Sequence, residues 1–189
     1  MATKTPFQTF ISEPLEALLG EKLQHVNYRI LTYEAPHFNL DAPNQTGPVT
    51  VRLEFMNHTL EVYAAPEKTL LDGTYYCILA GLIPAELLVP ENFCLVNADA
   101  SIQWSEAISQ TLEVVEVTGI RSSPQAIRFV FATKTVFLSS GYSGEGTVND
   151  PAIVGDGIEM LVFGDEEFFM AKRTLPDPWA EIWGSVRSN

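Results

Sequence analysis

Carboxylates and histidines are the side chains of this sequence that could carry acid–base or metal chemistry. The 189 residues include 24 Asp and Glu and 3 His. Paired carboxylates serve as general acids and bases, but so many are present that no particular pair is indicated. His25, His37 and His58 stand 12 and 21 residues apart, and no two have the i, i+4 spacing with which a helix presents metal ligands. We therefore predict neither a metal site nor a cofactor.

Nucleophiles and phosphate-binding turns are equally poorly supported. Cys77 and Cys94 lie in apolar stretches without CxxC spacing, which is typical of buried thiols in a reducing compartment. The glycine-rich residues 141–146 lack a following Lys and place Glu145 where a phosphate would be repelled. No Gly-x-Ser-x-Gly sequence occurs. The sequence therefore does not indicate an enzyme.

An acidic and aromatic segment is the first candidate for a binding surface. Asp165, Glu166 and Glu167 follow an apolar run and precede two phenylalanines. Such a run is typical of a solvated turn whose aromatics reach the core. Carboxylates around aromatic anchors are also typical of a surface that binds a basic protein. We predict these three residues as partner-binding residues.

A helix predicted over residues 176–189 supplies the second candidate. Asp177 is a favourable N-cap, and Pro178 suits the first helical position. Trp179 and Trp183 then share one face of the helix. That face would dock onto the protein's own sheet, or it would complete a dimer or partner interface. We therefore add both tryptophans to the predicted partner-binding residues.

The net charge indicates the class of partner. The 11 Lys and Arg leave a formal charge of −13, which repels nucleic acid and anionic membranes. Residues 69–120 and 135–171 contain no Lys or Arg. If the carboxylates of these windows lie on one side of the fold, their field would steer a basic protein partner. The short apolar run at the N-terminus predicts neither a signal peptide nor a membrane span, so we expect a cytoplasmic protein.

One line of residues occurs twice and predicts the architecture. Residues 51–65 and 127–141 match at an offset of 76, and each reads as a β-hairpin with Arg, Phe and Thr at identical places. The strand that begins at Leu23 matches a strand that begins at Leu112, at an offset of 89. Residues 74–79 match residues 158–163 at an offset of 84. The sequence thus predicts two tandem strand–hairpin–strand units.

These patterns predict an α+β fold that is mainly antiparallel β, with two units of about 80 residues sharing one core. The first unit is expected over residues 1–100 and the second over 101–175, followed by the helix over 176–189. Short helices are expected from Ser12 to Gly20 and over 84–89. The uncharged run 75–83 predicts either a buried strand or a short buried helix.

Three functions remain open from the sequence. The preferred one is a non-catalytic acidic protein that binds a basic macromolecular partner. In size, composition and strand pattern the chain resembles bacterial immunity proteins, which are small acidic cytoplasmic inhibitors of secreted toxins. The alternative is a small-molecule-binding or enzymatic β-rich domain with a pocket between the units, lined by Tyr75, Tyr76 and Trp104. The third is a structural subunit that forms a homodimer through the tryptophan face.

Overall fold

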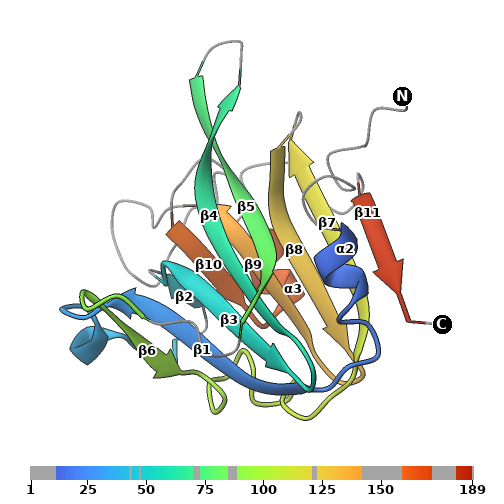
Figure 1. Ribbon diagram of the computed structural model, residues 1–189, viewed down its shortest axis with the longest axis horizontal. Helices are drawn as coiled ribbons and strands as arrows, with labels where there is room; N and C mark the ends of the chain where they lie inside the picture. Colours follow the sequence, from blue (N-terminus) through green and yellow to red (C-terminus); the bar gives the residue numbers. More distant parts are fainter. Residues whose placement is uncertain are drawn as a thin grey trace.

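A computed structural model of the chain describes residues 12–42, 44–46, 48–69, 73–84, 89–120, 123–141, 159–171 and 182–188. The fold consists of two antiparallel sheets packed face to face, with very little helix (Figure 1). The predicted antiparallel β content is confirmed, and it exceeds what the predicted α+β class implies. Period-two alternation of apolar residues governs most of the chain, and the described helices are α2 (Ser12–Glu16), α3 (Glu166–Ala171) and a 3-10 turn (Ala35–His37).

The two sheets have different strand orders. The first is five-stranded, in the order β5-β4-β3-β1-β6, and the second is six-stranded, in the order β11-β7-β8-β9-β10-β2. The strands of the first sheet are β1 (Leu23–Leu31), β3 (Thr50–Phe55), β4 (Thr59–Thr69), β5 (Gly73–Ile83) and β6 (Phe93–Asn97). Those of the second are β2 (Asn44–Thr46), β7 (Leu112–Ile120), β8 (Ser123–Phe131), β9 (Thr135–Gly141), β10 (Glu159–Phe163) and β11 (Ile182–Arg187).

The main core lies between the sheets. Inward-facing residues of both sheets form one buried apolar cluster, to which α2 adds Leu15 and the turn after it adds Leu18. Trp104 is fully buried in this cluster and donates a hydrogen bond from Nε1 to the Tyr28 hydroxyl, at 2.6 Å. Burial raises the pKa of Tyr28 far above its usual value, so the hydroxyl stays protonated. Trp104 is thus a core residue rather than the lining of an open pocket.

Each sheet contains a four-stranded meander, and the two meanders have the same register. In β1 and β3, Leu23 faces Phe55 and a bulge follows. In β7 and β8, Leu112 faces Phe131 and a bulge follows at the same place. The β3–β4 and β8–β9 hairpins also correspond, pair for pair, at the predicted offset of 76 residues.

The last strands of the two meanders correct one predicted offset. Val62 of β4 faces Ala80 of β5, and Leu138 of β9 faces Val162 of β10. Equivalent residues of β5 and β10 are therefore 82 positions apart and not 84. Side chains alternate along a strand with a period of two, so the error leaves every residue on its correct face.

The segments that enter the two meanders pair reciprocally. Gly20 N donates to Leu112 O at 2.9 Å, and Ser109 N donates to Leu23 O at 2.7 Å. Exchanging each residue for its equivalent 89 positions away converts one bond into the other. Gly20 and Ser109 are themselves equivalent, and both have positive φ angles, of 81° and 66°. The two meanders therefore meet as the two halves of a symmetric pair would.

The predicted helix over 176–189 is wrong where the structure describes this region. Residues 182–187 form strand β11, which pairs with β7 and aligns Val186 with Val115. The apolar spacing of Ile182 and Val186 is compatible with one face of a strand as well as one face of a helix. Pairing with the edge of β7 satisfies the backbone groups on that side of the strand, and this decides between them. Most of the turn predicted over 84–89 lies outside the described residues.

Candidate functional site

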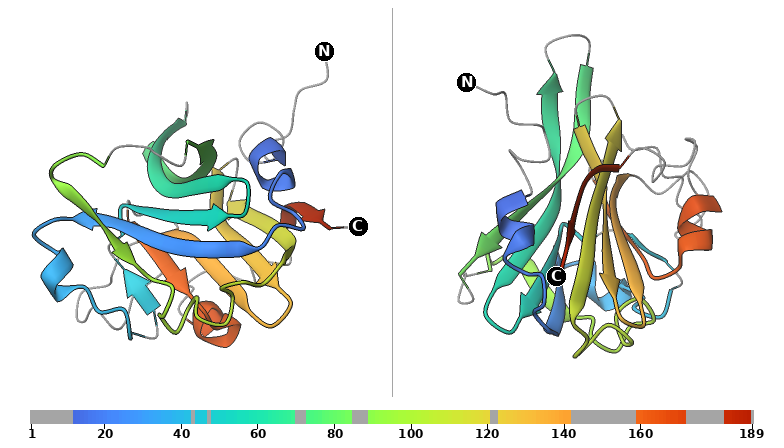
Figure 2. Two further views of the ribbon diagram at one scale, coloured as in Figure 1. Left: turned by 60° about the horizontal axis from the view of Figure 1, so that its bottom comes forward. Right: turned by 90° about the vertical axis from the view of Figure 1, so that its right-hand side faces the viewer.

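The predicted acidic segment, Asp165, Glu166 and Glu167, lies at the start of α3 on the outer face of the six-stranded sheet (Figure 2). All three side chains are exposed. Gly164 precedes them, and a Cβ there would lie 2.9 Å from the Cα of Gln103, so this close approach requires glycine. The helix N-terminus favours carboxylates in its first turn. Glu166 and Glu167 therefore lie in the first turn of a short helix rather than in the predicted turn, and Asp165 directly precedes it.

Phe169 fixes α3 to the sheet. Its ring stacks on Phe137 with centroids 4.9 Å apart and meets Phe163 edge-on at 5.3 Å. Together with Ala126 and Leu161 these rings form a second, smaller buried cluster outside the main core. The aromatic that follows the carboxylates thus reaches a core, as one of the two sequence interpretations expected, while the carboxylates themselves remain in solvent.

Arg128 connects the acidic segment to the sheet. Its Nη1 donates to Glu166 Oε1 at 3.2 Å, and its Nε donates to Glu116 Oε2 at 2.6 Å. Glu116 is buried, and Arg187 of β11 lies 3.6 Å from its other carboxylate oxygen. The guanidinium therefore connects Glu166 to the sheet, and Asp165 and Glu167 beside it are exposed.

The two predicted tryptophans are not brought to the acidic segment by any described contact. Trp179 lies outside the described residues. Trp183 belongs to strand β11 and not to a helix, so the predicted helical face that pairs it with Trp179 does not exist as proposed.

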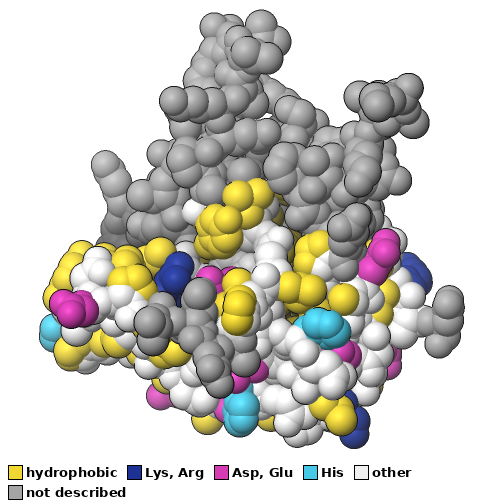
Figure 3. Space-filling view, in the orientation of Figure 1, with side chains coloured by type: hydrophobic (Ala, Val, Ile, Leu, Met, Phe, Trp, Pro, Cys, Tyr) yellow, Lys and Arg dark blue, Asp and Glu magenta, His cyan; other side chains and the backbone are white. Residues whose placement is uncertain are grey.

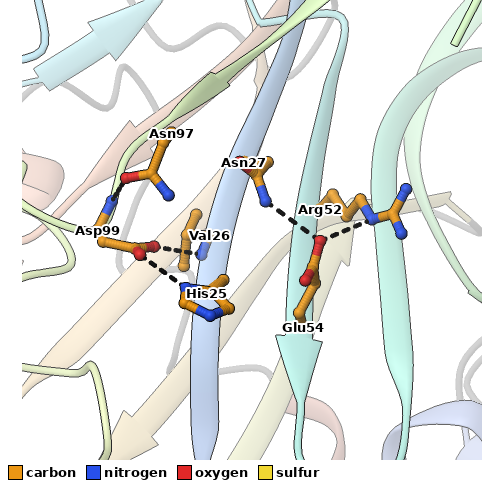
Figure 4. Close-up of polar contacts among 7 residues, drawn as sticks. All are labelled: His25, Val26, Asn27, Arg52, Glu54, Asn97 and Asp99. Atoms are coloured by element: carbon orange, nitrogen blue, oxygen red, sulfur yellow. Dashed lines mark hydrogen bonds and ion pairs between the residues drawn. The ribbon is translucent and has the colours of Figure 1, made fainter. Parts of the chain in front are cut away.

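A polar network on the outer face of the five-stranded sheet was missed by the sequence reasoning (Figure 4). His25 Nδ1 lies 2.8 Å from Asp99 Oδ2, and the Val26 N–H donates to Asp99 Oδ1 at 2.7 Å. Glu54 accepts from Asn27 Nδ2 at 3.1 Å, and Arg52 Nε is 3.1 Å from the same carboxylate. No sequence signal indicates these contacts, because Asp99 stands 74 residues from His25.

The histidine and aspartate of this network influence each other's ionisation. The hydrogen bond to Asp99 raises the pKa of His25 above its usual value, against a small opposing effect of burial. Burial alone would raise the pKa of Asp99. The hydrogen bonds from His25 and from the Val26 N–H outweigh burial and lower it. The two groups therefore form a charge-assisted pair over an intermediate range of pH.

Arg29, like Arg128 and Arg52, makes its contacts within the fold. Arg29 Nη2 donates to Thr50 Oγ1 at 2.6 Å, and its guanidinium carbon lies 5.6 Å from the centroid of the Phe93 ring. Glu61 Oε2 is 3.9 Å from Arg29 Nη1. Figure 3 shows this face of the molecule, on which hydrophobic side chains gather beside a few charged ones.

The exposed charge is mostly negative. Among the described side chains the exposed Lys and Arg residues are Lys22 and Arg187. The exposed carboxylates are Glu16, Asp41, Glu91, Glu106, Glu113, Asp165, Glu166 and Glu167. Arg29, Arg52 and Arg128 thus make their contacts within the fold, while most of the described acidic side chains face solvent.

The described part of the chain shows neither a metal-binding cluster nor a membrane-spanning helix. There, no group of three or more His, Cys, Asp and Glu side chains is arranged to hold a metal ion. Within the same residues, no helix has the length and apolar character needed to cross a membrane. Comparison of the chain with protein-family models, with curated proteins and with solved structures finds no match to any of them.

Proposed function

We propose that this protein is a non-catalytic acidic binding protein for a basic macromolecular partner. The observation that carries the proposal is the division of charge between fold and surface. Arg29, Arg52 and Arg128 each contact a carboxylate on a sheet face. Among the described side chains, exposed carboxylates outnumber exposed Lys and Arg, and the chain has a formal charge of −13, which supports a negative field around the molecule. An inhibitor of the immunity type would recognise a basic target in this way.

The acidic segment is the proposed centre of the binding surface. Arg128 restrains Glu166, and Phe169 restrains the helix, so Asp165 and Glu167 are presented from a positioned element. Preorganised charges lose less conformational entropy on binding than charges on an unrestrained turn. A cationic partner would therefore gain more from this segment than from isolated surface carboxylates.

Titration with a fluorescently labelled poly-lysine probe tests this function. We expect anisotropy to report binding at low ionic strength that weakens steeply as salt is added. The double variant Asp165→Asn/Glu167→Gln should lower the affinity about fivefold, which corresponds to roughly 0.5 kcal/mol for each exposed charge. Glu166 is left unchanged because it also holds Arg128.

The matched control is Asp41→Asn/Glu91→Gln. It removes the same number of exposed charges elsewhere on the surface, so it measures the effect of net charge alone. Equal losses for the two double variants would remove the acidic segment as the centre of the surface. No binding by the unmodified protein would contradict the proposed function.

We also propose that the two meanders are tandem copies of one unit. Three observations support this proposal: the shared register with its shared bulge, the reciprocal hydrogen bonds, and the positive φ angles at Gly20 and Ser109. If the units are copies, positions that differ between them mark where function was added. Glu61 of the first unit is Phe137 in the second, and Phe137 is the residue against which α3 packs.

A further inference from the structure

Four charged side chains follow one another across the outer face of the six-stranded sheet, from strand β11 to helix α3. In order of contact they are Arg187, Glu116, Arg128 and Glu166. Glu116, on β7, is 3% exposed, whereas the Glu166 side chain at the end of the series is 54% exposed. A buried carboxylate and an exposed carboxylate of the acidic segment thus share one guanidinium.

The buried carboxylate is contacted on both of its oxygens. Arg128 donates to Glu116 Oε2 from Nε, at 2.6 Å, and also from Nη2. Arg187 Nη2 lies 3.6 Å from Glu116 Oε1. A guanidinium is planar and its donors have fixed directions, so holding Nε and Nη2 on Glu116 also fixes the direction of Nη1, which donates to Glu166. Glu116 therefore determines where Arg128 meets the acidic segment.

The first meander shows that the fold does not require a carboxylate at this place. Arg52, the equivalent of Arg128, faces Asn27 in the β1–β3 pair. At the same place in the β7–β8 pair stands Glu116. Arg52 Nε lies instead 3.1 Å from Glu54 of its own strand. The carboxylate on the neighbouring strand thus occurs in the meander on which α3 packs, where the guanidinium also contacts the acidic segment.

We propose that Glu116 is a positioning residue for the acidic segment: through Arg128 it holds Glu166 in place for a basic partner that it does not itself touch. This inference rests on the proposed function. Glu116 also neutralises the guanidinium. With an uncharged side chain at this position, the charge of Arg128 would be left to cancel part of the negative charge that the partner recognises. Neutralising this buried carboxylate should therefore weaken binding more than neutralising an exposed one.

Anisotropy of labelled poly-lysine, titrated with the full chain, tests this consequence. Arg128→Lys keeps the net charge, but an ammonium group lacks the fork that holds two carboxylates, so we expect affinity to fall about threefold. Arg52→Lys is the matched control, because it makes the same exchange at the equivalent arginine of the first meander, and it should leave affinity unaltered. Glu116→Gln should lower affinity about fivefold, against about twofold for Glu91→Gln, which removes one exposed charge elsewhere.

Hydrogen exchange tests the positioning without any partner. In α3 the Phe169 N–H donates to the backbone oxygen of Asp165 at 3.0 Å. Exchange of this amide should become about tenfold faster in Arg128→Lys and in Glu116→Gln, and it should not change in Arg52→Lys. Glu116→Asp keeps the charge and should restore part of both the affinity and the protection. A thermal melt identifies any variant that does not fold, and either the lysine or the glutamine variant alone can decide.

Equal effects of Arg128→Lys and Arg52→Lys on poly-lysine binding would overturn the proposal. So would exchange of the Phe169 amide that neither Arg128→Lys nor Glu116→Gln accelerates, because α3 would then not depend on this network. Absence of binding by the unmodified protein would contradict the proposed function instead. The exchange measurement would in that case still decide whether Glu116 positions the acidic segment.

Discussion

Gly20 stands directly before the first meander and Ser109 directly before the second. The two residues differ in how well they tolerate the backbone conformation found there. Gly20 and Ser109 both have left-handed backbone conformations. This conformation costs a non-glycine residue roughly 1–2 kcal/mol. Glycine avoids that cost but loses about 0.4–1 kcal/mol through the entropy of the unfolded chain. The steric term is the larger one, so glycine is the better residue at both positions.

The first prediction follows from this equivalence. Ser109→Gly should raise the free energy of unfolding by about 0.5 kcal/mol, and Gly20→Ala should lower it by about 0.5–1 kcal/mol. An added Cβ at Gly20 has no neighbour within 4 Å, so the change measures backbone strain and not a clash. Urea denaturation of the two variants gives both values. Effects of the same sign in the two variants would contradict the proposed equivalence.

The second prediction concerns the His25–Asp99 pair. A raised histidine pKa contributes stability below the unfolded pKa of about 6.5, and this is lost as pH rises through the folded pKa. A lowered aspartate pKa contributes stability above about 3.8, and this is lost as pH falls through the folded pKa. The pair should therefore stabilise the fold most near pH 5.

Replacing His25 with glutamine exposes this pH dependence. We expect the loss in free energy of unfolding to be about 0.5 kcal/mol near pH 5 and smaller near pH 8, since a 57% exposed ring is screened by solvent. Urea denaturation at several pH values measures it. His37→Gln, at an exposed site in the 3-10 turn, serves as the control for removal of a histidine outside this network. A His25→Gln loss that is constant across pH would exclude an ionic contribution.

At the scale of elements, α3 depends on one aromatic side chain. Phe169 is fully buried between Phe137 and Phe163, outside the main core. Phe169→Ala should lower the free energy of unfolding by about 3 kcal/mol, whereas Phe169→Leu should cost about 1 kcal/mol. Poly-lysine binding should weaken in the alanine variant, because the acidic segment loses its support. Unchanged binding would show that α3 does not position the segment.

The sequence predicted the elements whose periodicity and end signals agree. Both hairpins and the strand at Leu23 are confirmed. The short helix begins at Ser12 as predicted but ends at Glu16 and not at Gly20. The run 75–83, for which the sequence allowed either a strand or a short helix, is a strand. The helix over 176–189 was wrong because Ile182 and Val186 suit either period, and only the edge of β7 selects a strand. A local apolar pattern can be compatible with both a helix and a strand, and the edge of a neighbouring strand then determines which one forms.

Site contacts were less predictable than elements. The exposure of Asp165, Glu166 and Glu167 agreed with their charge. The bond from Arg128 to Glu166 could not be foreseen, because it joins residues 38 positions apart through the packing of α3. Glu116 looked like one of many surface carboxylates in a window without basic residues. It is instead buried, because β7 lies beside Arg128 in the sheet.

At the scale of the whole molecule, the two halves use equivalent outer faces differently. The second unit covers its face with α3, through an apolar cluster centred on Phe169. The first unit has Glu61 and Gly81 at the positions equivalent to Phe137 and Phe163, and its face carries the polar network. If the two units are copies, as we propose, the repeat keeps one core and its outer surfaces have diverged.

The charge of the whole molecule should also affect its stability. With a formal charge of −13, exposed carboxylates repel one another in the folded state, and added salt screens that repulsion. We expect the free energy of unfolding to rise by roughly 1 kcal/mol between about 10 mM and 150 mM salt. Asp41→Asn/Glu91→Gln should stabilise the protein at low salt by a few tenths of a kcal/mol.

The acidic segment should respond differently, because its carboxylates stand at the N-terminus of α3. There the favourable interaction with the helix dipole opposes the general repulsion. Asp165→Asn/Glu167→Gln should therefore stabilise the protein less than the control at low salt, and the difference should disappear at about 0.5 M salt. Urea denaturation at both ionic strengths measures the two effects. A larger stabilisation at residues 165 and 167 than at 41 and 91 would mean that repulsion is concentrated at α3, and that a basic partner would relieve it there.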